Sequence, residues 1–195
     1  MTAPKTAPKS ARKDGSPGGG MARLLEIMRK LRDPVDGCPW DQVQTNQTIA
    51  PYTIEEAYEV AEAIAEDDTQ ALKDELGDLL FQVVFYAQMA AEAGQFTFAD
   101  IVEGISGKMV RRHPHVFGDA SVEDAEAQTA EWEAHKKQER EARAKARGDE
   151  PSALDGVPAA LPALERALKL QKRAARVGFD WPDAAGALEK LEEEG

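Results

Sequence analysis

The chain has 195 residues, enough for one well-buried domain with an appendage, because domains usually contain about 100–150 residues. Its formal net charge of -12 disfavours nucleic-acid binding, which needs clustered lysine and arginine. The single cysteine, Cys38, cannot form an internal disulfide, no signal-like stretch opens the chain, and no apolar run reaches the roughly 18 residues of a membrane span. We therefore expect a cytoplasmic protein with no nucleic-acid partner and no membrane partner.

Helical periodicity dominates the sequence, and alternating runs rich in Val, Ile and Thr are absent. The pattern predicts an all-α fold with a helical bundle as its core. Composition divides the chain into a disordered tail (1–20), a helical domain with a carboxylate hairpin (21–118), a long charged helix (119–147), a linker (148–160) and a C-terminal helical segment (161–195).

Two helices of the second segment are predicted to form an antiparallel hairpin. The first spans residues 53–66, where Thr53 and Glu56 have the spacing of a capping box. The second spans residues 70–92 and follows a turn rich in aspartate. A further amphipathic helix is expected over residues 98–112, since the next two residues are His-Pro.

The second hairpin helix carries acidic residues in an apolar setting. Residues 76–91 are apolar in nearly every direction around a helix, which is typical of a buried helix, yet Asp78 lies among them. An unpaired buried carboxylate is costly, so we expect Asp78 to be protonated, paired with a cation or bound to a metal. Glu75 lies one turn earlier on the same face.

The first hairpin helix carries Glu55, Glu56 and Glu59 beside its apolar stripe. Across an antiparallel hairpin, residues whose numbers add to the same total lie level, and this holds for Glu56 with Asp78 and for Glu59 with Glu75. Four converging carboxylates repel unless a cation neutralises them, and oxygen ligands select Mg²⁺ or Mn²⁺. The alternative is that the first helix presents solvated charges and that Glu56 only caps it.

A cationic face follows on the third helix, where Lys108, Arg111 and Arg112 are spaced to lie together. Such a face suits a phosphate partner, and Mg²⁺ commonly binds proteins through a few carboxylates plus substrate phosphates. The alternative is that these side chains only offset the dipole at the end of the helix.

These motifs resemble those of the MazG family of nucleotide pyrophosphohydrolases. The resemblance covers about residues 22–182 and is carried by five stretches: Gly37-Cys38-Pro39-Trp40-Asp41, Ile49-Ala50-Pro51-Tyr52-Thr53, Glu55-Glu56-x-x-Glu59, Glu75-Leu76-Gly77-Asp78-Leu79-Leu80-Phe81-Gln82, and Lys108-x-x-Arg111-Arg112-His113-Pro114-His115-Val116-Phe117.

The resemblance implies a four-helix-type core that dimerises, extra C-terminal helices, and Mg²⁺-dependent hydrolysis of nucleoside triphosphates, including non-standard ones, to monophosphate and pyrophosphate. It implies metal ligands at Glu56, Glu59, Glu75 and Asp78, triphosphate contacts at Lys108, Arg111 and Arg112, a nucleotide-binding turn that starts at Tyr52, and a nucleotide neighbour at Trp132. Trp132 could equally be a packing anchor for a polar helix. Longer members carry two copies of the hairpin, and residues 188–195 lie about where a truncated second copy would begin.

The expected chemistry is in-line attack of a water on the α-phosphorus, with Glu55 as the residue that helps to activate the water. A diiron bundle is disfavoured, because none of the three histidines has a glutamate three residues earlier. A non-catalytic helical regulatory or interaction module, a vestigial half of a two-copy enzyme, remains the alternative. Trp40 could stack on a base or pack a dimer core.

Overall fold

The structure is a computed structural model that describes residues 17–119, 121, 124–150 and 152–194. Throughout these residues the regular structure is helical and contains no strand, which confirms the predicted all-α class. The helices are α1 (Pro17–Leu31), α2 (Pro39–Gln42), α3 (Asn46–Ala65), α4 (Thr69–Glu92), α5 (Phe98–Arg112), α6 (Pro114–Phe117), α7 (Ala125–Arg147), α8 (Ala163–Ala175) and α9 (Ala184–Glu194).

The predicted tail lies mostly outside the described residues, which begin at residue 17, and residues 17–20 already belong to α1. The chain forms two compact units, with the boundary between Lys108 and Met109 inside α5. No described helix combines the length and apolar character needed to cross a membrane.

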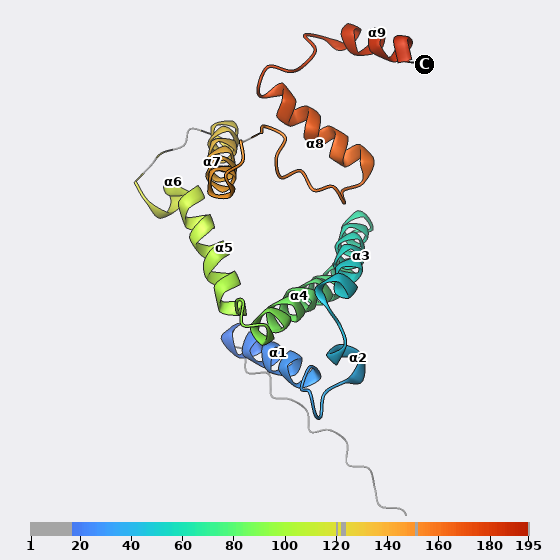
Figure 1. Cartoon of the computed structure of the whole chain (residues 1–195), viewed down its shortest axis with the longest axis vertical. Coiled ribbons are helices and arrows are strands. Elements are labelled where there is room, and N and C mark those ends of the chain that lie inside the picture. Colours follow the sequence, from blue (N-terminus) through green and yellow to red (C-terminus); the bar gives the residue numbers. More distant parts are fainter. Residues whose placement is uncertain (1–16, 120, 122–123, 151, 195) are drawn as a thin grey trace, which may run out of the picture. The chain divides into compact units, whose positions relative to one another are not determined.

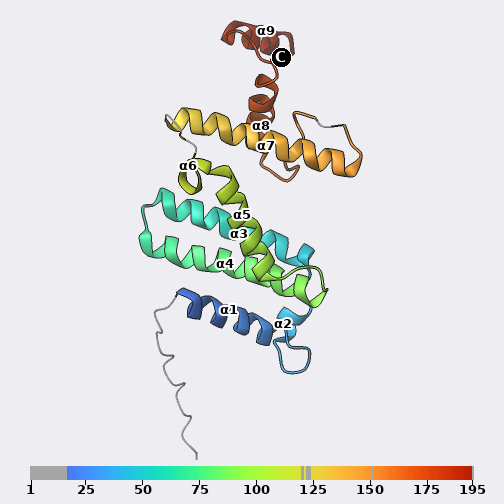
Figure 2. The same ribbon diagram turned by 90° about the vertical axis from the view of Figure 1, so that its left-hand side faces the viewer.

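In the first unit, α3 and α4 form the predicted antiparallel hairpin and run side by side (Figures 1 and 2). Asp67 in the turn adopts a left-handed backbone with φ of 56°. Asp68 caps α4, because its carboxylate accepts hydrogen bonds of 2.9 Å from the backbone N–H groups of Gln70 and Ala71. Local turn and capping chemistry therefore defines where the two helices meet.

The predicted start of the first hairpin helix at Thr53 is wrong, because α3 begins at Asn46. The capping box is formed instead by Thr45 and Thr48, each of which hydrogen-bonds the other's backbone N–H. Pro51 lies inside α3, where it costs one backbone hydrogen bond without ending the helix. The apolar core nearby includes the fully buried Ile49 on the first turn of α3, which favours this longer helix.

The core of the first unit is formed by α1, α3 and α4. Its buried members are Met28, Ile49, Val84, Phe85 and Met89. Partly buried side chains surround it, including Phe98 at the start of α5, so this helix also touches the core. The buried residues of α4 lie in its second half, from Gln82 to Ala90, which leaves the half nearer the turn more open.

Arg32 joins the end of α1 to the end of α4, and its side chain is only 9% exposed. Its guanidinium donates to both carboxylate oxygens of Glu92, at 2.7 Å for the closest pair, and to the backbone oxygens of Asp41 and Gln44. It also lies 5.4 Å from the centre of the Phe85 ring. These hydrogen bonds lower the pKa of the Glu92 carboxyl. One side chain therefore anchors the α1–α3 connection to the core.

The second unit contains the end of α5, the short α6, and α7 to α9. The long helix α7 is linked to the region after α8 by an ion pair between Glu133 and Arg176. The helix α8 is amphipathic, and Gly178, with φ of 85°, lies just beyond its end.

Replacing Arg32 with methionine is expected to lower the free energy of unfolding by about 2–3 kcal/mol, because it removes the charge-assisted hydrogen bonds to Glu92 and to the backbone oxygens of Asp41 and Gln44. Arg29→Met is the matched control, since Arg29 pairs with Glu26 on the exposed face of the same helix and should change stability by less than about 0.5 kcal/mol. Urea unfolding measures both. Equal losses would contradict an anchoring role for Arg32.

Candidate metal centre

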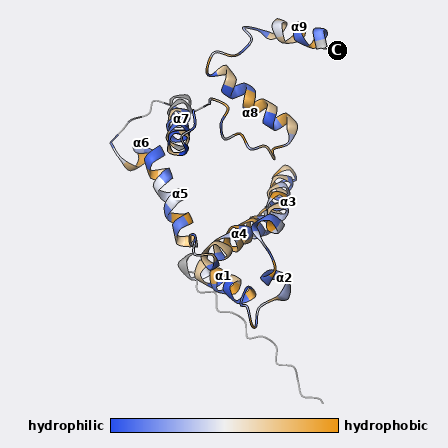
Figure 3. Ribbon diagram, viewed as in Figure 1, coloured by the Kyte–Doolittle hydropathy of each residue, from blue (hydrophilic) through white to orange (hydrophobic). Residues whose placement is uncertain are grey.

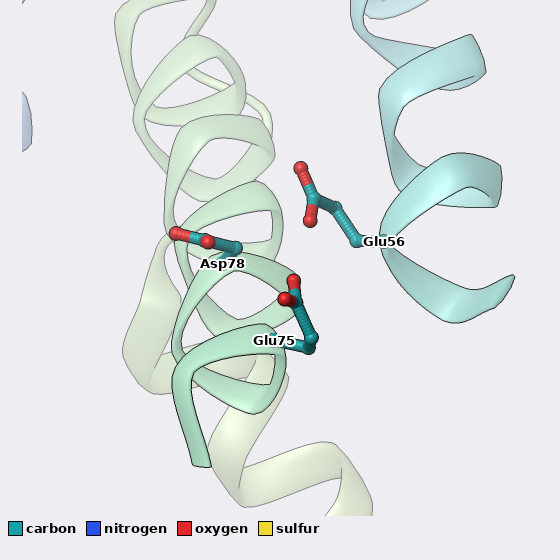
Figure 4. A group of neighbouring side chains, drawn as sticks. All are labelled: Glu56, Glu75 and Asp78. Carbon is teal, nitrogen blue, oxygen red and sulfur yellow. The ribbon is translucent and has the colours of Figure 1, made fainter. Parts of the chain in front are cut away.

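Three carboxylates meet between the two hairpin helices. Glu56 projects from α3, while Glu75 and Asp78 lie one turn apart on α4, and one oxygen of each lies within 4.8 Å of the others. Figure 4 shows Glu56 reaching across the hairpin toward the other two side chains. The antiparallel register therefore brings Glu56 and Asp78 to the same height, as the sequence pattern predicts.

Asp78 is exposed, so the expectation that it is buried among apolar residues is wrong. The reason is that the buried residues of α4 begin only at Gln82, whereas Leu76 and Leu80 beside Asp78 are 49% and 37% exposed. Glu56 and Glu75 are half-buried. The convergence of the carboxylates thus depends on helix register rather than on burial of a lone charge.

Mutual repulsion and burial oppose ionisation within this group. The pKa of Glu56 is raised first by burial and then by the charges of Asp78 and Glu59. The pKa of Glu75 is raised by burial, then by Glu59 and Asp78. Both glutamates therefore hold their protons more tightly than an ordinary glutamate does. The solvent does not fully compensate the negative charge that gathers here.

Glu59 lies outside the group of three whose oxygens meet within 4.8 Å. Its charge and a side-chain hydrogen bond nevertheless raise the pKa values of both Glu56 and Glu75, so it is close to the group. Its assignment as a fourth ligand stays a prediction.

The donor set fits a hard divalent cation. Mg²⁺–oxygen bonds of about 2.0–2.1 Å place neighbouring ligand oxygens about 3 Å apart and opposite ones about 4 Å apart, so modest side-chain rotation suffices to close this group around an ion. Within the described part of the chain, no lysine or arginine forms an ion pair with Glu56, Glu75 or Asp78. A bound cation would supply the missing positive charge.

The residues of α3 that are predicted to act on the nucleotide are accessible to solvent. Glu55 and Tyr52 are both exposed, and the Tyr52 ring makes an edge contact with Trp40, with ring centres 6.0 Å apart. Trp40 is itself half-exposed, so its outer face is open to a ligand or a partner. The catalytic role of Glu55 and the binding role of Tyr52 stay predictions.

The predicted triphosphate contacts have different environments along α5. Lys108 is half-buried, Arg111 is exposed, and the side chain of Arg112 is 12% exposed and forms a 2.6 Å ion pair with Glu139. Because Arg111 and Arg112 belong to the second unit, the structure does not test whether they act with the carboxylates.

Trp132 on α7 lies in a small aromatic and cationic cluster of the second unit. Its ring centre is 6.1 Å from that of His113 in an edge contact, and the Lys136 ammonium lies 4.7 Å from its ring centre. These contacts show that Trp132 packs within its own unit, and its predicted position beside a nucleotide stays a prediction.

Gln82 belongs to the MazG-like stretch from Glu75 to Gln82, although the sequence pattern predicts no role for it in the site. It lies one turn after Asp78 on the same face of α4, is 8% exposed, and its side-chain oxygen has no hydrogen-bond partner among the described residues. The sequence signal for Gln82 as a neighbour of the candidate metal centre is its polar side chain, four positions after Asp78 in an apolar stretch.

Glu56→Gln is expected to stabilise the metal-free protein, because it removes one of the repelling charges that raise the neighbouring pKa values. The same change should weaken Mg²⁺ or Mn²⁺ binding by at least about tenfold. Glu62→Gln, on an exposed part of α3, is the control and should do neither. Urea unfolding in EDTA and titration calorimetry measure the two effects. A destabilised variant that retains full metal affinity would refute the shared site.

Several known proteins are similar to this chain. Residues 44–117 match the family model described as the MazG nucleotide pyrophosphohydrolase domain. The chain is 57% identical over 172 residues to a nucleoside triphosphate pyrophosphohydrolase of Escherichia coli, covering 88% of this chain and 64% of the relative. It is 46% identical to the nucleoside triphosphate pyrophosphohydrolase/pyrophosphatase MazG of Thermotoga maritima, covering 88% of this chain and 63% of the relative. The chain thus spans somewhat less than two thirds of the length of these relatives.

A solved structure, the crystal structure of a mazG-related protein from Thermotoga maritima, matches with a TM-score of 0.50 and 29% sequence identity, over 60% of this chain and 98% of that one. Pyrophosphohydrolases of this family are generally metal-dependent, in keeping with the acidic group. Residues 44–117, which match the family model, include all of α3 and α4 and therefore every carboxylate of the candidate centre. The chain therefore carries, at residues 44–117, a nucleotide pyrophosphohydrolase domain of the MazG family.

Proposed function

We propose that this chain hydrolyses nucleoside triphosphates to nucleoside monophosphates and pyrophosphate, with Mg²⁺ as its metal and Mn²⁺ as a substitute. The observation that carries the proposal is the meeting of Glu56, Glu75 and Asp78 across the hairpin, without a neutralising cation from the described residues. The names of the similar proteins from E. coli and T. maritima support the same reaction.

In the proposed mechanism, Glu56, Glu75 and Asp78 would hold the metal, and Glu59 would complete or orient this set. The ion, when bound, supplies positive charge to the triphosphate and lowers the pKa of a water. Glu55 accepts a proton from the attacking water, for which its exposed position on α3 leaves room.

The triphosphate would be bound on its β and γ oxygens by Lys108, Arg111 and Arg112. Arg112 must then exchange or share its ion pair with Glu139, since its guanidinium already binds that carboxylate. Trp132 would lie near the nucleotide. We further propose that the substrates include non-standard nucleotides. Turnover of a panel of ordinary and modified triphosphates tests this, and analysis of the products gives the position of cleavage.

We also propose that the chain forms a homodimer through α3 and α4. The apolar stripe of α3 faces solvent, with Ile54, Tyr58 and Ile64 exposed by 51%, 55% and 61%. Leu76 and Leu80 of α4 are exposed as well, and Figure 3 shows hydrophobic residues along both helices. Contiguous exposed apolar side chains of this kind mark association surfaces.

Asp78→Ala and Glu59→Ala are each expected to reduce Mg²⁺-dependent release of pyrophosphate by at least about a hundredfold, because each removes a predicted ligand. Glu62→Ala, an exposed glutamate on the same helix as Glu59, is the control and should retain activity. Detection of pyrophosphate and monophosphate in equal amounts establishes the cleavage position.

Retained turnover in Asp78→Ala would rule out the assigned centre. If the unchanged protein binds neither Mg²⁺ nor a non-hydrolysable triphosphate in calorimetry, the non-catalytic interaction module is the correct description instead.

Tyr58→Glu is expected to shift the chain from dimer to monomer in light scattering after size exclusion, because it places a charge within the apolar stripe of α3. Val35→Glu is the control, since Val35 is 83% exposed in a loop outside that stripe. An unchanged mass for Tyr58→Glu would locate the dimer surface elsewhere, and a monomeric unchanged protein would refute the dimer.

A further inference from the structure

A cavity of about 370 Å³ lies within the second unit, between α7 and the region around the end of α8. Four of its lining residues are cationic. Lys137 and Arg140 are three positions apart on α7, and Arg173 and Arg176 have the same spacing at the end of α8, so each pair shares one helix face. The hydroxyl-bearing Ser152 also lines it.

The lining carries an excess of positive charge. Its acidic members are Glu133 and Glu141, against four lysine and arginine side chains. The whole chain has a formal net charge of -12, so a positive cavity runs against the general balance of the protein. Anions in solution are therefore drawn to this location over most of the remaining surface.

Existing contacts position the arginines but only partly neutralise them. Arg176 is paired with Glu133, and Arg173 donates to the backbone oxygen of Asp155. Arg140 has no ion-pair partner within the part of the chain that the structure describes. A backbone oxygen carries no net charge, so the charge of Arg173 also remains available.

The cations are close enough to act on one another. The pKa of Arg173 is lowered first by burial and then by the charge of Arg140, with Arg176 contributing in the same direction. Burial alone would raise the pKa of the Glu133 carboxyl, yet Lys136, Arg176 and Arg140 hold it below its usual value. Like charges gathered around a cavity are unfavourable until an anion enters it.

We propose that this cavity binds a small phosphate-bearing anion. Guanidinium groups present forks of N–H donors that match phosphate oxygens, and here they approach from two helices. The Lys137 ammonium, which lies 3.9 Å from a carboxylate oxygen of Glu141, is a further donor. The volume lies near the lower end of the range of about 300–1,000 Å³ for small-molecule sites, which suits a phosphate group or a pyrophosphate. The site consists of residues distinct from the carboxylates of α3 and α4, so it does not depend on the proposed hydrolysis.

The test is titration calorimetry of the full chain with inorganic pyrophosphate in EDTA at low salt. Without a divalent metal the acidic group of α3 and α4 repels the anion, so binding reports on the basic cavity alone. Arg140→Gln and Arg173→Gln are each expected to weaken binding by at least about tenfold, the usual effect of losing a charge-assisted hydrogen bond. Arg166→Gln, an exposed arginine elsewhere on α8, should leave affinity within about twofold.

Urea unfolding in the absence of pyrophosphate tests whether a variant binds less only because it has lost its fold. Arg173→Gln should be as stable as the unchanged protein or more stable, because it relieves repulsion from Arg140 and Arg176. No binding of pyrophosphate in EDTA, or equal weakening by Arg166→Gln, would overturn the proposal. Loss of binding in Asp78→Ala under these conditions would do the same, because it would locate the anion at the acidic group.

A parallel titration with a nucleoside triphosphate, also in EDTA, identifies the source of the phosphate. If the nucleoside triphosphate binds more tightly than pyrophosphate, the ligand is a nucleotide. If it binds equally or more weakly, the ligand is a free polyphosphate. Both outcomes support the cavity as a phosphate site, provided that Arg140→Gln and Arg173→Gln reduce the affinity.

Discussion

Repulsion between carboxylates across the α3–α4 hairpin is the constraint on which the candidate centre depends. Glu56, Glu75 and Asp78 bring oxygens within 4.8 Å of one another, and burial and charge raise the pKa values of the first two. A hairpin selected only for stability would not place these groups face to face. Apolar packing around Phe85 and Met89, in the second half of α4, has to offset this repulsion when the hairpin forms.

This arrangement also explains an unusual distribution of side chains on α3. The helix turns Glu56 toward α4 while Ile54, Tyr58 and Ile64 remain exposed, so a carboxylate points inward and an apolar stripe points outward. In most surface helices the apolar stripe faces the core. The inversion is consistent with a helix that serves a metal on one side and a second copy of the chain on the other, as proposed above.

Much of the fold follows from local sequence signals. The hairpin, the helix over residues 98–112 and the level pairing of Glu56 with Asp78 could all be predicted, because capping residues, apolar spacing and the rise per residue determine them. The early start of α3 does not follow from the sequence pattern, because Pro51 resembles a helix boundary while the cap that starts the helix lies at Thr45. The exposure of Asp78 could not be deduced either, because periodicity shows that a helix is apolar but not how much of it a single chain covers.

The turn at Asp67 and Asp68 has a consequence for how such sequences can diverge. Because Asp68 caps α4 directly after the left-handed Asp67, the length of this turn sets the phase of one helix against the other. One residue inserted within either helix between the turn and the acidic group would rotate its carboxylates by about 100° and move them by about 1.5 Å along the axis. The segment from Glu56 to Asp78 should therefore keep its length among chains that retain the proposed metal centre.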